Sequence, residues 1–72
     1  MRTVPVEGGQ AVFDMGDSSA SLVSATPAAG WSKQVVPDRW WIRVVFTNRT
    51  GQTVSVMCSW YQQAPRVDVV RG

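Results

Sequence analysis

Two stretches with strict period-two alternation of apolar residues constrain the fold of this chain most. The alternating residues are Trp40, Ile42, Val44 and Phe46 in the first stretch and Val54, Val56, Cys58 and Trp60 in the second. Successive side chains of a β-strand point to opposite faces of a sheet, so each stretch predicts a strand that buries one face. The intervening residues 48–52, NRTGQ, predict a tight turn between the two strands.

The turn sets the register of this hairpin. Placing Asn48 opposite Gln52 leaves residues 49–51 as a three-residue loop, and Gly51 suits the left-handed last position of such a loop. The same register brings both apolar rows onto one face, whereas a slip of one residue would turn a whole row outward. The expected pairs are Phe46 with Val54, Val44 with Val56, Ile42 with Cys58, and Trp40 with Trp60.

The rest of the chain alternates in the same way, with frequent breaks at Gly, Pro, Asn, Asp and Ser. We expect strands at residues 3–6, 10–15, 20–26, 31–36, 39–48, 52–62 and 66–70. A chain of 72 residues forms one small domain, which buries about 60% of the surface exposed when it is unfolded. The predicted fold class is all-β, with residues 1–72 forming a single antiparallel β-sandwich or curled sheet of six to seven short strands. The expected core contains Phe13, Leu22, Val35, Trp40, Ile42, Val44, Phe46, Val54, Val56 and Trp60.

The residue inventory restricts the possible chemistry. The chain has one cysteine and no histidine, so it cannot form an intramolecular disulfide, a Cys/His zinc site or a Ser–His or Cys–His catalytic pair. Cys58 lies on the inward row and is expected to be a small core residue. The acidic residues of DMGDSS, residues 14–19, fit a capped turn better than a calcium loop. We therefore predict a protein that is not an enzyme, with no catalytic residues, no metal and no cofactor.

Charge and hydropathy restrict the partners. The formal net charge is only +2 and the basic residues are scattered singly, which makes nucleic acid an unlikely partner. No apolar stretch approaches the roughly 20 residues that span a bilayer, and MRTVPVEGGQ lacks the apolar segment of a secretion signal. We expect a location in the cytoplasm, or in a particle assembled there such as a virion, with no membrane association.

The second face of the predicted hairpin has an unusual composition for a solvent-exposed surface. Tryptophan, tyrosine, methionine and arginine are enriched in interface cores, and two arginines flank Trp41, where their guanidinium groups can stack on its ring. The candidate partner-binding residues are Arg39, Trp41, Arg43, Val45, Met57 and Tyr61. The sequence leaves open whether another molecule or the chain's own remaining strands cover this face.

Residues 59–66, SWYQQAPR, resemble the WYQQ...P stretch of immunoglobulin variable domains, in which the tryptophan packs on an inter-sheet disulfide. The likeness covers about eight residues, and a chain with one cysteine cannot form that disulfide. We interpret the stretch as an amphipathic strand that ends at a proline turn and transfer no functional residues from that family.

Two functions are compatible with these observations. The first is a non-enzymatic structural or assembly protein that presents a β-sheet face to protein partners or copies of itself, for example an accessory subunit of a virion such as a phage head or tail. The alternative is a small binding module that stacks single-stranded nucleic acid or sugar on exposed Trp41 and Tyr61. Neither hypothesis involves a small-molecule substrate.

Overall fold

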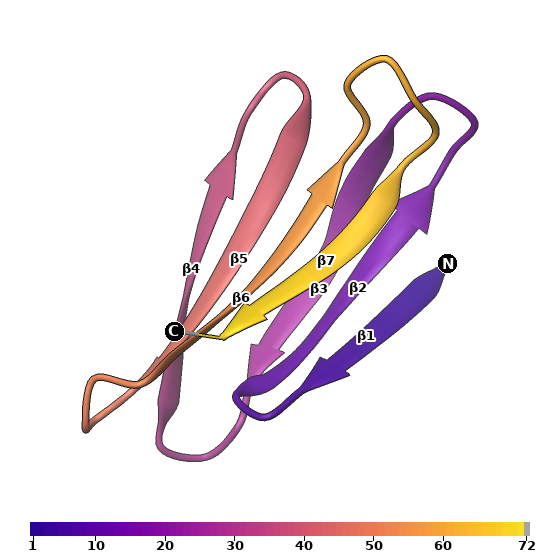
Figure 1. The fold of residues 1–72 in the computed structure, drawn as a ribbon. Helices are drawn as coiled ribbons and strands as arrows, with labels where there is room; N and C mark the ends of the chain where they lie inside the picture. Colours follow the sequence, from indigo (N-terminus) through magenta and orange to yellow (C-terminus); the bar gives the residue numbers. More distant parts are fainter. Residues whose placement is uncertain (72) are drawn as a thin grey trace.

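The computed structural model describes residues 1–71, which form seven antiparallel strands and no helix (Figure 1). The strands are β1 (Arg2–Val6), β2 (Gly9–Met15), β3 (Ala20–Pro27), β4 (Trp31–Pro37), β5 (Trp41–Asn48), β6 (Thr53–Ser59) and β7 (Arg66–Arg71). The all-β fold class is confirmed, and each predicted strand corresponds to one observed strand. Within residues 1–71, no helix is long and apolar enough to cross a membrane.

The strands form two sheets, one with the order β1-β2-β3 and one with the order β4-β5-β6-β7. Each strand pairs with its neighbour in the chain, so both sheets are simple meanders joined by residues 28–30. Figure 1 shows the hairpin of β1 and β2 beside β3, with the four-stranded sheet forming the second layer. Apolar residues from both sheets form one shared cluster between the layers.

The core lies where the two sheets face each other. Phe13 of β2 and Phe46 of β5 are its largest fully buried side chains, and Val44 and Val56 are also fully buried. Burying one such side chain contributes roughly 1.5–3 kcal/mol. The middle of β5 and β6 therefore supplies much of the stability of this small fold.

The predicted hairpin register is confirmed along the ladder, from the pair of Trp41 and Ser59 to the pair of Thr47 and Thr53. Phe46 pairs with Val54, Val44 with Val56, and Ile42 with Cys58. The backbone N–H of Asn48 donates to the carbonyl of Gln52 over 3.0 Å, and Gly51 adopts a φ of 88° in the loop. The Asn48 side-chain oxygen Oδ1 also accepts bonds from the N–H of Thr50, the hydroxyl of Thr50 and the N–H of Gln52. These bonds fix the turn and with it the register.

The predicted core needs three corrections. Trp40 is 39% exposed, because it precedes the first residue of β5 and lies in the turn closed by the Asp38 N–H and the Trp41 carbonyl. Val35 is 38% exposed, because it lies on β4, an edge strand of its sheet. Leu22 is only partly buried. The other seven predicted core residues are buried.

The three-stranded sheet contributes core residues that the sequence prediction omitted: Val4, Ala11 and Ala25. Two of these residues are alanines, whose small side chains give a weak hydrophobic signal. The backbone of Gly8 also lies very close to the Trp31 side chain, because a Cβ atom at Gly8 would be only 2.6 Å from Cε3 of Trp31. The turn between β1 and β2 therefore packs directly on the half-buried Trp31 ring.

Candidate protein-binding surface

The outer face of the four-stranded sheet carries four of the six predicted partner-binding residues. Trp41, Arg43 and Val45 alternate with the core residues of β5, and Met57 of β6 lies opposite Arg43. The three-stranded sheet packs on the other face of these strands, where the shared core lies. The chain's own second sheet therefore does not cover this surface, which we call the outer face.

Contacts within the sheet hold the residues of the outer face in place. The Arg43 guanidinium lies over the Trp41 ring, with its Cζ atom 5.5 Å from the ring centroid. Trp41, Val45 and Met57 are partly buried by their neighbours, whereas Arg43 is exposed. The predicted stacking of Arg43 on Trp41 is thus confirmed. The outer face therefore presents an apolar ring and a cation side by side.

A shallow groove of about 590 Å³ continues the outer face towards β7. Its lining residues are Arg43, Ser55, Met57, Asp68, Val69 and Val70. Asp68 also forms an ion pair with Arg66, with the two charged groups 3.1 Å apart. The groove thus combines apolar side chains with charges of both signs.

Arg39 and Tyr61 do not join the outer face. Strand β5 begins at Trp41 and β6 ends at Ser59, so the predicted pairing of Arg39 with Tyr61 lies beyond the observed ladder. Arg39 instead lies over the ring of Trp40, with its Cζ atom 5.1 Å from the centroid. The prediction that Arg39 stacks on Trp41 is therefore wrong.

Trp40 and Tyr61 meet edge to face, with their ring centroids 5.4 Å apart. Together with Arg39 they form an aromatic end cluster that the sequence interpretation missed. Trp40 lies in the β4–β5 connection and Tyr61 in the β6–β7 connection, and Figure 1 shows both connections at the same end of the four-stranded sheet. The signal was present in PDRW, residues 37–40, where proline and aspartate indicate a turn rather than a continuing strand.

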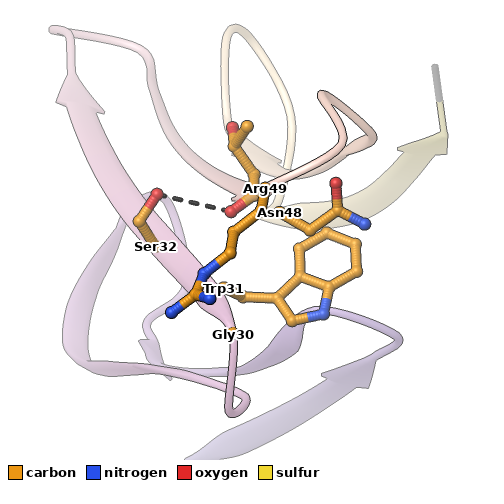
Figure 2. A pocket seen from close by; sticks show the side chains of 6 residues that line it. Gly30, Trp31, Ser32, Asn48 and Arg49 are labelled. Carbon is orange, nitrogen blue, oxygen red and sulfur yellow. Dashed lines mark hydrogen bonds between the residues drawn. The ribbon is translucent and has the colours of Figure 1, made fainter.

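A second pocket, of about 450 Å³, lies at the opposite end of the hairpin, beside the β5–β6 turn. Figure 2 shows the Trp31 ring and the Arg49 side chain in its wall, with the Ser32 hydroxyl bonded to the Thr47 carbonyl. The Asn48 side chain also lines the pocket, but its amide donates to the Gln52 side chain and its oxygen accepts bonds within the turn. The polar groups here therefore serve the turn.

The remaining candidate groups for chemistry are structural. Burial raises the pKa of the Cys58 thiol, an effect that the charge of Arg2 partly offsets. The Cys58 Sγ atom lies 3.9 Å from the Met15 sulfur inside the core. Among residues 1–71, no three acidic or sulfur side chains come together in a way that could hold a metal ion.

Comparisons with known proteins add no functional information, because no family model, curated protein or solved structure matches this chain. The functional interpretation therefore depends on the surfaces described above.

Proposed function

We propose that this chain is a non-enzymatic assembly protein whose outer face binds protein partners, including copies of itself. The observation that supports this most is the position of Trp41, Arg43, Val45 and Met57 together on a sheet face that the second sheet leaves open. Tryptophan and arginine are the residue types most often found as energetic hot spots of interfaces. Aspartate, glutamate and lysine are sparse on these two strands.

The adjacent tryptophans allow a matched test of this proposal. Trp41→Ala removes a ring from the outer face and should weaken association by about 2 kcal/mol or more if that ring is a hot spot. Trp40→Ala removes the same side chain from the end cluster and should leave association through the outer face unchanged. Sedimentation or native mass spectrometry measures both. A wild-type chain that stays monomeric at high concentration would contradict self-association, and a greater effect of Trp40→Ala would contradict the choice of surface.

A role as an accessory subunit of a larger particle, such as a virion head or tail, is the finer form of this proposal. It rests on the small all-β fold and the open sheet face, which suit a building block. Genes for particle structural proteins next to the gene for this chain would support it. A neighbourhood of metabolic genes would count against it.

The aromatic end cluster favours a second candidate function, the stacking of a planar ligand. Trp40 is 39% exposed and Tyr61 is 55% exposed, and Arg39 supplies a positive charge beside them. This combination is typical of single-stranded nucleic acid binding, in which bases stack on rings and cations contact phosphates. For this second candidate we therefore propose Trp40, and not Trp41, as the stacking residue.

Fluorescence titration tests the second candidate. Single-stranded oligonucleotides should quench tryptophan emission, and Trp40→Ala should abolish the change while Trp41→Ala keeps it. Quenching by oligosaccharides instead would identify a sugar ligand. No quenching by either ligand would remove the stacking function.

A further inference from the structure

The free edges of the two sheets differ in how they are protected against pairing with another strand. Proteins block exposed edges with prolines, bulges and inward-pointing charges. In the part of the chain that the structure describes, β1 contains Pro5, β3 ends at Pro27, and β4 ends at Pro37. Strand β3 also has a register shift opposite Val12 and Phe13. Strand β7 has no proline and no register shift over its six residues RVDVVR, and its one charge on the inner row is Arg71, the last residue of the strand.

Strand β4 carries an additional inward charge. Its Lys33 is on the core side of the sheet, opposite Phe46, and its Nζ donates to the Ala25 carbonyl of the other sheet over 2.7 Å. Strand β7 by contrast carries exposed valines on both faces, with Val69 46% exposed and Val70 58% exposed, and has no side chain bonded to the other sheet. Of the four edge strands β1, β3, β4 and β7, β7 is therefore the least protected against pairing with another strand.

The hydrogen-bond alternation shows which groups β7 offers. The Trp60 N–H donates to the Trp40 carbonyl over 2.9 Å, so even-numbered residues of this part of the chain bond towards β5. Odd-numbered residues of β6 then bond to β7, where Met57 is opposite Asp68. In an antiparallel ladder neighbouring residues bond to opposite sides. The backbone N–H and C=O groups of Val67 and Val69 consequently face the free edge.

We propose that β7 pairs antiparallel with β7 of a second copy of this chain, centred on Val67, and joins two four-stranded sheets into one. Residues 66–68 of the two copies form the pair, and next to them Val69 faces Pro65, which can accept a bond from Val69 but has no N–H to donate. Charge selects the register, because centring on Val67 places Arg66 of each copy opposite Asp68 of the other. Centring one position later on the same edge would bring the two Asp68 carboxylates together. Opposite charges in directly facing positions stabilise a strand pair, and like charges destabilise it.

The existing ion pair between Arg66 and Asp68 strengthens this argument. The two side chains lie on the same face, 3.1 Å apart, and are 60% and 48% exposed. A second copy would complete a square of two arginines and two aspartates in which each carboxylate contacts two guanidinium groups. The proposal rests on the self-association suggested above and assigns it to the backbone edge of β7, which borders the outer face.

Charge reversal tests the pairing. Asp68→Arg gives a strand with arginine at both positions, and Arg66→Asp gives one with aspartate at both, so each variant should self-associate about tenfold or more weakly than the wild type. Mixing the two variants should restore a dimer, because each strand then meets its complement. Analytical ultracentrifugation of the separate and mixed variants measures both effects.

Matched controls separate pairing from fold and net charge. Arg49→Asp and Asp17→Arg make the same charge changes away from β7 and should leave self-association unchanged. Circular dichroism should show a folded sheet in all four variants, since an exposed ion pair contributes little to stability. Failure of the mixed variants to dimerise, or a wild-type chain that is monomeric, would overturn the β7 pairing.

The outcomes also separate the two surfaces. If Trp41→Ala weakens self-association while the charge reversals do not, the outer face is the interface and the β7 pairing is wrong. If the charge reversals weaken self-association and Trp41→Ala does not, the β7 pairing stands without the outer face.

Discussion

The two faces of the β5–β6 hairpin have the same backbone and the same register but different energetic roles. Residues on the inner face, such as Phe46 and Val56, are fully buried against the three-stranded sheet. Residues on the outer face, such as Trp41 and Met57, contact only their neighbours in the sheet and remain partly exposed. We therefore expect burial, rather than side-chain size alone, to set the contribution to stability, so that the buried Phe46 contributes more than the larger but partly exposed Trp41.

Removing a large, fully buried side chain of the inner face should give the largest loss of stability. Phe46→Ala deletes a fully buried ring and should cost about 3–5 kcal/mol, because the rigid sheets cannot close the resulting cavity. Small domains have little stability to lose, so much of the variant should be unfolded at room temperature. Urea denaturation followed by circular dichroism measures the change. A loss below about 1 kcal/mol would show that Phe46 is not central to the core.

A change in the β5–β6 turn tests what fixes the hairpin register, which decides the face on which each side chain lies. Asn48→Ala removes the oxygen that accepts bonds from two backbone N–H groups and from the Thr50 hydroxyl. We expect a loss of about 1–2 kcal/mol, which is modest because these groups can bond to water. Thermal unfolding provides the measurement. Arg49→Ala is the control in the same loop and should change stability by less than about 0.5 kcal/mol.

Truncation on the outer face should have a smaller effect on stability than either of these changes. Trp41→Ala removes the stacking with Arg43, which contributes about 0.5–1 kcal/mol at an exposed site, and some half-buried surface. Its free energy of unfolding should stay well above that of Phe46→Ala in the same urea series. A loss as large as that of Phe46→Ala would make Trp41 part of the intramolecular core and would remove the support for a binding surface.

The smallest expected effect is a pH dependence that originates on the inner face. The pKa of Cys58 is raised above its ordinary value of 9.0 in the folded state, so above that pH the unfolded chain loses the thiol proton while the folded chain keeps it. The stability is therefore complete below pH 9.0 and should decline as the pH rises towards the folded-state pKa. Cys58→Val should remove this part of the alkaline decline in urea denaturation, and an unchanged profile would contradict it.

The prediction from sequence succeeded where local information was sufficient. The turn residues from Asn48 to Gly51 and the two alternating rows agree on one register, and the observed ladder follows it. It failed at the other end of the hairpin, where Trp40 was assigned to the core although it lies in the turn before β5, and where Arg39 was paired with Tyr61 beyond the ends of the strands. An apolar residue in a turn can continue the alternation of the neighbouring strand, so the pattern alone does not show where the strand begins.

The sequence by itself determined the strands, the central hairpin and the four residues shared by the outer face, because alternation and turn chemistry act between near neighbours. Only the tertiary structure decided which face the second sheet covers, which of the paired residues Trp40 and Trp60 is buried, and that β7 keeps an open edge. These features depend on where one sheet packs on the other. That packing joins residues far apart in the chain, so no local pattern records it.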